Sequence, residues 1–506
     1  MDKFDDWSLT LAVFLPLVGM IGVLVTPKRQ ELAQKTIALA TSLVTLAVGV
    51  IVLTRFDWSD KAVQLGVSKE WIPLINSRYD IGVDGIGLPL LLLSMFITVL
   101  VIIYSWDHFP EPHNPRGFLA LMLLLEVGMN GTFVSQDLIL FFVFFEIVLL
   151  PMFFMIGVWG GPNRKYASLK FFLFTLFGSA LMLLGFLALF FLSKSNTFSI
   201  TELTAMANDG TLKISSTTAL WIFGGLFLGF AIKVPMFPFH TWLPDAHTEA
   251  PTQGSVLLAA ILLKLGTYGF VKIAMPILPE ASKTWAPYIG ALSVIGIIYG
   301  SLCCLAQTDV KRLIAFSSVA HMGFVMLGIS TRTTFGMNAA LFGMVAHGLI
   351  TGMLFFLAGS IQHRFHTREI ARLGGLLKNA PRLGWILGFS AMASLGLPGL
   401  AGFWGEFPAV LSAFSPAKGL DVNLFRVYMV IASIGTVLAA GYLLWMFQRV
   451  AFGEVKEEFK DAHIHDVHVT EWLAWTPLLA LIVVFGVYPD LLFRYFNAPI
   501  SALFGG

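Results

Sequence analysis

The chain consists largely of apolar segments of about twenty residues, separated by mostly short polar connections. Hydrophobic residues make up 57% of its 506 residues and charged residues only 12%. A soluble protein of this length would need far more polar surface. An α-helix of about 20 apolar residues, by contrast, spans the hydrocarbon core of a bilayer. The sequence therefore predicts an all-α, multi-pass membrane protein.

A window of about 19 residues predicts about fourteen membrane-spanning helices. They are expected at residues 7–26, 34–54, 84–106, 117–134, 138–158, 167–193, 219–240, 252–275, 285–306, 311–330, 336–363, 382–414, 424–452 and 471–495. The first segment follows the acidic stretch MDKFDDW, and a small-residue cleavage site is absent. We therefore expect a retained helix and not a signal peptide.

Basic residues are distributed unequally between alternate connections. The side that carries Lys28 and Arg29 has the larger number, mainly because of the connection around residues 364–382. Basic loops tend to stay in the cytoplasm, so this side is expected to be cytoplasmic and both chain ends to face outward.

Two predicted helices, the seventh and the twelfth, are interrupted by proline and glycine, in KVPMFP (233–238) and GLPGLAG (396–402). Non-helical backbone at membrane depth must be buried in protein or line a hydrated cavity. Each break has one ionisable residue, Lys233 or Glu406, 173 positions apart (406 − 233). Asp137 and Asp309, at the starts of two other spans, are 172 positions apart (309 − 137).

These matching offsets predict two inverted repeats of five helices each, with helices seven and twelve discontinuous. The repeats are expected at residues 117–275 and 276–452, after three helices in 1–116 and before a connection and last helix in 453–506. Coincidental kinks, which are common in membrane helices, are the alternative.

Ionisable residues lie within several of the predicted helices. Lys233, Lys264 and Glu146 are each preceded by a long apolar run, and Glu126 lies one turn before Asn130. A charge at this depth costs several kcal/mol, so such residues usually mark ion pathways. Snorkelling to the interface is the structural alternative, but neither lysine is near the end of its run. Lys233 is the candidate partner of Glu146, and a change in their pairing would load or release a proton.

His321 and His347 add groups that titrate near neutral pH, with Ser317 and Thr351 one turn away from them. Taken alone, each histidine would be more typical of a structural hydrogen-bonding group. Together with the buried Glu and Lys residues, they provide the series that a proton route requires. Metal binding is not expected, because the histidines lack ligand spacing.

The segment from His240 to Thr252 lies at the mouth of the broken seventh helix and contains two histidines and two carboxylates. A hydrated proton entrance and a purely structural loop are both compatible with it. The adjacent Cys303 and Cys304 fit neither a redox motif nor a cluster site, so no cofactor is expected in this chain. The net charge of +2 gives no indication of nucleic-acid binding.

Three motifs resemble one known family. They are AIKVPMFPFHTWLPDAHTEAPTQGSVLLAAILLKLGTYG (231–269), DVKRLIAFSSVAHMG (309–323) and GLPGLAGFWGEF (396–407). They are similar to the antiporter-like subunits of respiratory complex I, the proton-pumping NADH:quinone oxidoreductase. At Glu406 the chain resembles the subunit M branch of this family, because the sister subunits usually have a lysine at this position.

The resemblance implies a set of functional residues. The main proton-channel residues would be Glu146, Lys233, Lys264 and Glu406, with His321 and His347 as linking groups and Glu126 and His240 as further polar positions of the central axis.

The resemblance also implies that redox chemistry and proton translocation take place in different subunits. FMN, iron–sulfur clusters, NADH and quinone would be bound by partner subunits, and this chain would translocate protons between two homologous antiporter-like subunits in the lipid of a bacterial inner membrane. It would thus be part of a translocase without doing redox chemistry itself. Two alternatives stay open: a subunit of a multisubunit sodium/proton antiporter, and a pump module of a hydrogenase or plastoquinone-linked complex.

Overall fold

The computed structural model describes residues 5–460 and 464–504. These residues contain thirteen helices that are long and apolar enough to cross a membrane. They are α1 (Asp5–Val25), α2 (Glu31–Arg55), α3 (Gly87–Tyr104), α4 (Pro115–Val134), α5 with α6 (Leu138–Trp159), α7 (Arg164–Leu192), α9 (Ser216–Lys233), α11 to α13 (Thr252–Ile277), α14 (Pro279–Leu305), α15 (Val310–Ser330), α16 (Thr334–Phe365), α20 (Val422–Ala451) and α21 (Val469–Val487). The chain is therefore a mainly helical multi-pass membrane protein, and the predicted fold class is confirmed apart from one small hairpin.

The two helices with proline and glycine are broken, also as predicted. The seventh ends at Lys233 and resumes as α10 (Trp242–Glu249). The twelfth forms α18 (Pro381–Ser394) and α19 (Ala401–Ser412), each too short to count among the thirteen. Gly396 and Gly399 adopt φ values of +81° and +91° in the turn between them, a conformation that favours glycine.

The last predicted span, at residues 471–495, is wrong at its end. Helix α21 stops at Val487, and a separate helix, α22 (Asp490–Phe504), follows Pro489. A residue before proline is disfavoured in helical conformation, so the chain turns at Tyr488. Helix α22 has one buried side, formed by Leu492, Phe496 and Ile500.

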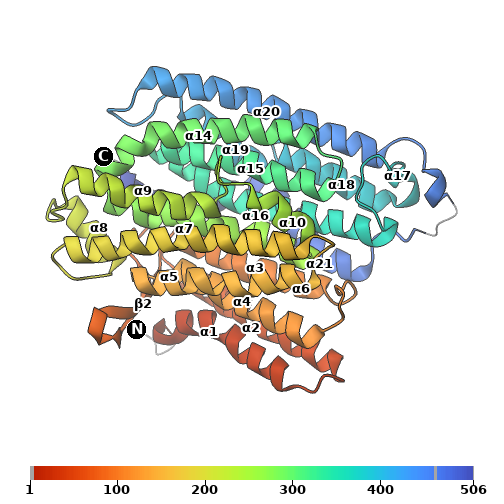
Figure 1. Cartoon of the computed structure of the whole chain (residues 1–506), viewed down its shortest axis with the longest axis horizontal. Helices are drawn as coiled ribbons and strands as arrows, with labels where there is room; N and C mark the ends of the chain where they lie inside the picture. Colours follow the sequence, from red (N-terminus) through yellow and green to blue (C-terminus); the bar gives the residue numbers. More distant parts are fainter. Residues whose placement is uncertain (1–4, 461–463, 505–506) are drawn as a thin grey trace.

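The helices differ in how much of their apolar surface is covered. In α16 the whole apolar window is buried, and in α15 and α11 to α13 94% of it is. For α2, α20 and α21 the buried share is only 33%. Helices α15, α16 and α11 to α13 therefore form the centre of the bundle, with α20 and α1 with α2 at its opposite sides (Figure 1).

Small elements cover the ends of the bundle. The antiparallel strands β1 (Gln64–Ile72) and β2 (Ser77–Val83) form a hairpin within what the sequence predicted only as a polar connection. The hairpin and α8 (Ile200–Asn208) lie at one end, and α17 (Leu376–Asn379) lies toward the other (Figure 1).

Asp137 and Asp309 have the same local structure. The Asp137 carboxylate accepts hydrogen bonds from the amides of Ile139 and Leu140 at the start of α5, and Asp309 accepts one from Arg312 at the start of α15. Both residues also begin an antiparallel bridge, Asp137 with Ser199 and Asp309 with Glu369. Equal offsets in the sequence thus correspond to similar caps and similar bridges.

Candidate functional site

Lys264 lies at the centre of the bundle, fully buried, in α12 (Leu263–Gly269). Two π-helical turns, Leu258–Leu262 and Phe270–Ala274, flank this helix. Such turns are frequent at functional sites. The Lys264 ammonium donates a hydrogen bond to the carbonyl oxygen of Ala259 at 2.6 Å, and its Nζ lies 2.7 Å from Nδ1 of His347.

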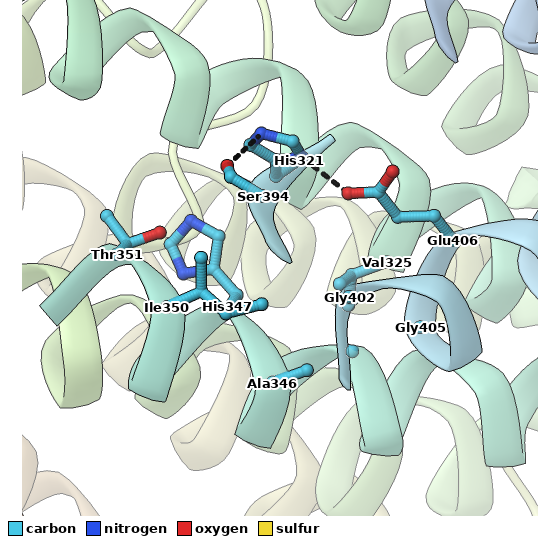
Figure 2. A pocket seen from close by; sticks show the side chains of 11 residues that line it. His321, Val325, Ala346, His347, Ile350, Thr351, Ser394, Gly402, Gly405 and Glu406 are labelled. Atoms are coloured by element: carbon cyan, nitrogen blue, oxygen red, sulfur yellow. Dashed lines mark hydrogen bonds and ion pairs between the residues drawn. The ribbon is translucent and has the colours of Figure 1, made fainter. Parts of the chain in front are cut away.

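His347 connects Lys264 to a second histidine. The ring of His347, in α16, lies 6.1 Å from the ring of His321, in α15, measured between centroids. His321 Nδ1 is 2.5 Å from Oε1 of Glu406, in the middle of α19 (Figure 2). The four side chains Lys264, His347, His321 and Glu406 thus form a series across four helices, which we call the central series.

Both nitrogens of His321 have partners. Nδ1 contacts Glu406, and Nε2 lies 3.2 Å from the hydroxyls of Ser394 and Tyr442. A neutral imidazole has one donor and one acceptor nitrogen, whereas the protonated ring has two donors. The carboxylate and the two hydroxyls can satisfy either form, since a hydroxyl both donates and accepts. Both ring nitrogens of His321 therefore have a suitable hydrogen-bond partner in either form of the ring.

A cavity of about 20 Å³ lies between the two histidines and Glu406 (Figure 2). Thr351 and Ser394 also line it, so polar groups face it from several sides. A cavity of about 10–15 Å³ or more with two or more polar partners can hold a water molecule. A single water would connect the His347 and His321 rings, which do not touch.

Glu146 and Lys233 are neighbours but not hydrogen-bonded partners. They are close enough to interact electrostatically, but they form no ion pair in the described part of the chain. The Lys233 ammonium lies over the ring of Phe145, 4.7 Å from its centroid, and neither it nor Glu146 Oε1 has a hydrogen-bond partner within residues 5–460 and 464–504. The two residues of the predicted pair thus lie near each other, but no hydrogen bond or ion pair joins them among the described residues.

Glu126 and His240 lie apart from the central series. Glu126 accepts a hydrogen bond from the Ser42 hydroxyl at 3.0 Å. Asn130, one turn on, instead bonds Ser94 and the carbonyl of Ala12. The His240 ring packs on Phe237 and Tyr299, with no hydrogen bond to Nδ1 from any described residue.

Two further lysines are buried, which the sequence analysis did not anticipate. Lys272 and Lys311 fall near the ends of the predicted spans 252–275 and 311–330 and were not among the candidate residues, but their exposed fractions are only 8% and 1%. Lys272 forms an ion pair with Asp84, and the Lys311 ammonium donates a hydrogen bond to the carbonyl of Ala250. Both lie near the ends of apolar runs, where sequence alone does not distinguish a loop charge from a buried one.

The segment between His240 and Thr252 is held in place by specific contacts. Asp245 binds Lys170 at 2.7 Å, and Glu249 accepts a hydrogen bond from the amide of Asn163. His247 is buried against Phe355, and neither of its ring nitrogens has a partner among the residues described. It lies close enough to Lys311 and Lys264 to interact electrostatically with both.

A larger cavity, of about 390 Å³, opens beside this segment. Glu249, Lys311, His363 and Arg368 are among the residues that line it. It therefore brings polar and titratable groups together beside the segment that contains His247.

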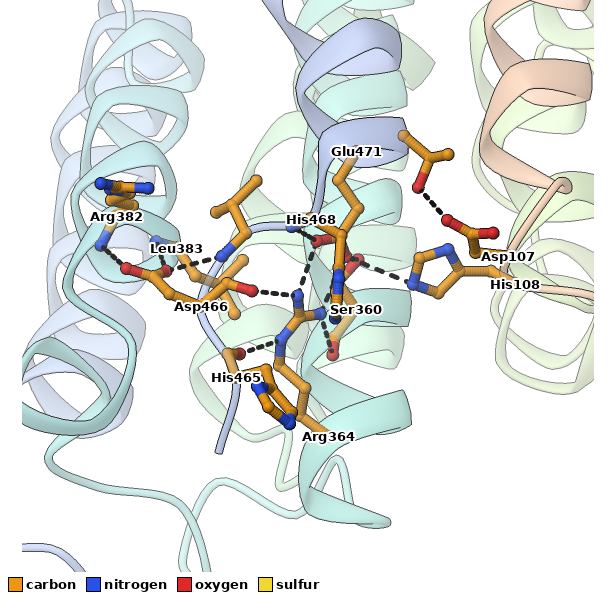
Figure 3. Close-up of polar contacts among 12 residues, drawn as sticks. Asp107, His108, Ser360, Arg364, Arg382, Leu383, His465, Asp466, His468 and Glu471 are labelled. Carbon is orange, nitrogen blue, oxygen red and sulfur yellow. Dashed lines mark hydrogen bonds and ion pairs between the residues drawn. The ribbon is translucent and has the colours of Figure 1, made fainter. Parts of the chain in front are cut away.

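An ion-pair network connects α3, α16 and α21 (Figure 3). Arg364 donates hydrogen bonds to both carboxylate oxygens of the fully buried Glu471, at 2.8 and 2.6 Å. Ser360 donates a third, and His108 lies 3.4 Å away. Arg364 also binds the carbonyls of His465 and Asp466, which attaches the connection before α21 to α16.

Comparison with known proteins places the chain in a family. Residues 135–438 match the family described as NADH:quinone oxidoreductase/Mrp antiporter, TM, and residues 11–132 match NADH-ubiquinone oxidoreductase chain 4, amino terminus. The chain is 39% identical to NADH-quinone oxidoreductase subunit M of Rickettsia prowazekii (strain Madrid E), over 98% of both proteins. It belongs to the subunit M family.

Solved structures agree with membership of the subunit M family. One chain of respiratory complex I from Thermus thermophilus with bound NADH is 29% identical, with a TM-score of 0.86 over 98% of this chain and 100% of that one. A chain of the Mrp complex from Dietzia sp. DQ12-45-1b reaches a TM-score of 0.84 at 19% identity, covering 99% of this chain and 98% of that one, which shows a shared fold only.

Proposed function

We propose that this member of the subunit M family translocates protons across a membrane through the central series. The observation that carries the proposal is the continuity of Lys264, His347, His321 and Glu406, since the only gap between them is the cavity beside the two rings. All four side chains bind and release protons, and three of them are at most 6% exposed. Such a series at the centre of an apolar bundle is typical of a proton relay.

Protons would enter from the cavity that Lys311 and Glu249 line. His247 lies between this cavity and Lys264, and its free ring nitrogens can accept a proton and pass it on. From Lys264 the proton would move to Nδ1 of His347, through a water molecule to His321, and then to Glu406. The two hydroxyls on His321 would hold its ring in position during both transfers.

Glu146 and Lys233 would control the transfer. Because the two charges attract without touching, a small movement changes their interaction strongly. Lys233 ends α9 at the helix break, where the backbone can move more readily than inside a regular helix. Closer approach would keep the lysine protonated, and separation would release its proton toward Lys264. Glu126 and His240 would extend the polar axis on either side.

The proposal also covers the assembly. The relatives of this chain are named as NADH-quinone oxidoreductase subunits, so electrons would pass from NADH through FMN and iron–sulfur clusters to quinone in partner proteins. This chain would do no redox chemistry and would lie between two homologous antiporter-like subunits, in a bacterial inner membrane.

We further propose that the two halves are inverted repeats of five helices, residues 117–275 and 276–452. The similar caps and bridges of Asp137 and Asp309 support this, as do the two helix breaks. Lys233 and Glu406 would then be equivalent positions in the two halves, one cationic and one acidic.

The proposal is tested by isolating the tagged chain from native membranes with its partners and measuring NADH-driven proton uptake in sealed vesicles. Glu406→Gln should abolish transfer to the end of the series, whereas Glu406→Asp should retain part of it. Partners without flavin or iron–sulfur proteins would contradict the assembly, and proton movement driven by Na⁺ without NADH would favour an antiporter.

A further inference from the structure

An apolar groove of about 390 Å³ lies on the side of the bundle formed by α2, α21 and α22, and none of the four residues of the central series lines it. It is bordered by α2, α3, α16, α21 and α22. Its walls include the apolar side chains of Leu46, Leu53, Leu92, Phe96, Leu349 and Phe485. Apart from Arg494 and the hydroxyl of Tyr495, the groove offers no polar side chain.

The groove covers about two-thirds of the height of one acyl layer. It extends from Leu53 to Leu46 along α2 and from Pro89 to Phe96 along α3. Seven residues of helix span about 10 Å, and the hydrocarbon layer of one leaflet is about 15 Å thick. The groove thus begins at the end of the bundle where α22 lies and stops near the middle of the membrane.

A polar hollow of about 470 Å³ lies at the same end. Trp58, Ser59, Asp490 and Asn497 line it, and Arg494 lines both the hollow and the groove. The Arg494 guanidinium lies over the Tyr495 ring at 5.4 Å, but it forms no ion pair and its buried Nε has no hydrogen-bond partner in residues 5–460 and 464–504. A buried N–H without a partner is unfavourable unless a ligand satisfies it.

We propose that the groove and the hollow together form a binding site for one zwitterionic phospholipid. An acyl chain fills the groove, and the phosphate accepts hydrogen bonds from Arg494, whose planar guanidinium suits phosphate oxygens. The Asp490 carboxylate, one helical turn before Arg494, faces the ammonium of an ethanolamine headgroup. Trp58 lies at the depth where indole rings usually border the lipid headgroups.

Helix α22 holds the site in a fixed position. A side chain at Gly85 would come within 1.8 Å of the carbonyl oxygen of Tyr495, so α22 lies directly on the segment before α3. The Tyr495 ring lies 6.2 Å from that of Phe56, and Asn338 donates a hydrogen bond to Asn497 at 2.6 Å. The phosphate-binding residue is therefore placed by contacts with α2, α16 and the turn before α3.

The test uses the chain in its native assembly and a phosphatidylethanolamine that carries a photoreactive diazirine in one acyl chain. Labelling followed by peptide mass spectrometry should place the probe on residues 89–96 and 345–349. Arg494→Gln should lower labelling about tenfold, since a charge-assisted contact of about 1.4 kcal/mol is lost. Leu92→Trp should lower it as well, because the indole would fill the groove while Arg494 remains.

Arg426→Gln is the matched control. Arg426 is an exposed arginine that donates a hydrogen bond to the carbonyl of Phe414, and it is far along the chain from the residues of the groove. The Arg426→Gln substitution should therefore leave labelling unchanged. A diacylglycerol with the same diazirine, which has no phosphate, should label wild type as weakly as the phospholipid labels Arg494→Gln. Equal labelling by the two probes, unchanged labelling in Arg494→Gln, or crosslinks from these residues to a helix of another protein would overturn the proposal.

Discussion

Nζ of Lys264 and Nδ1 of His347, 83 positions apart in the sequence, lie 2.7 Å from each other in the centre of the bundle. Nδ1 can accept a hydrogen bond only when it carries no proton, and a neutral amine can accept one from the ring when it does. The two nitrogens therefore share one hydrogen bond, along which a proton can move from one to the other. Under the proposed route, this pair would receive protons from the cavity beside Lys311.

The first prediction concerns the contact that places Glu406. A Cβ on Gly405 would lie 2.5 Å from the Cα of Gly343, so α19 and α16 touch through their backbones here. Gly405→Ala must push the helices apart and move the Glu406 carboxylate away from His321. We expect lower NADH-driven proton uptake in vesicles and a loss of about 1–3 kcal/mol in stability, measured by thermal unfolding.

Gly441→Ala provides the control for this substitution. Gly441 lies in α20, and a Cβ there would meet no atom within 4 Å. It should leave proton uptake unchanged and slightly favour the helix, because alanine has the higher helix propensity. Similar losses in both variants would show that the Gly405 contact has no specific role.

The sequence predicted candidate residues, but not how they contact one another. Lys264 and His347 stand out in the sequence because burying an ionisable residue in an apolar membrane segment costs free energy. This can be recognised from the residue types alone. Their contact depends on how α12 packs on α16, which no local pattern encodes. The same reason explains Glu146 and Lys233: residue types suggested an ion pair, whereas the Lys233 ammonium lies on the Phe145 ring.

A second prediction concerns the Arg364–Glu471 pair. Arg364→Ala would leave the Glu471 carboxylate buried with only Ser360 and His108 as side-chain partners. Removing one partner of a buried ion pair costs about 3–5 kcal/mol. We expect a strong decrease in the unfolding temperature and release of the connection before α21, detectable as faster proteolysis within residues 453–468.

The exposed pair Arg372 and Glu458 is the matched comparison. Its nitrogen–oxygen distance is also 2.6 Å, but the side chains are 48% and 39% exposed. Exposed pairs of this kind contribute about 0–1 kcal/mol, so Arg372→Ala should barely change the unfolding temperature. An equally large decrease would mean that burial does not decide the strength of the Arg364 pair.

A third prediction concerns pH, through Asp80 in the β1–β2 hairpin. Burial, with the nearby charge of Asp137, raises the pKa of Asp80 from 3.8 to about 6. Because the folded pKa is raised, the contribution of this group to stability is fully present below pH 3.8 and is lost as pH rises through about 6. Asp80→Asn should therefore raise the unfolding temperature at pH 7.5 and leave it nearly unchanged at pH 4.

Thermal unfolding at several pH values between these limits checks the prediction. The difference between the Asp80→Asn variant and wild type should grow mainly between pH 4 and 6. A constant difference across the range would mean that the substitution acts through shape or hydrogen bonding and not through ionisation.

Helix ends and loop contacts were the least predictable parts of the fold. The broken helices followed from proline and glycine, which act locally. The burial of Lys272 and Lys311, in contrast, did not follow from local sequence, because Asp84 and the carbonyl of Ala250 reach them from distant parts of the chain. Helix α22 was merged with α21 in the predicted span, since both are rich in apolar residues and only Pro489 separates them.

The most direct test of the central claim is the ratio of protons translocated to NADH oxidised, in sealed vesicles that contain the assembly with His347→Gln. Glutamine keeps a polar side chain in place but cannot titrate, so the series from Lys264 to His321 is interrupted. Loss of a positioned acid–base group costs about 100-fold in proton transfer, and we expect the ratio to fall clearly below that of wild type. A wild-type ratio in this variant would contradict the proposed route.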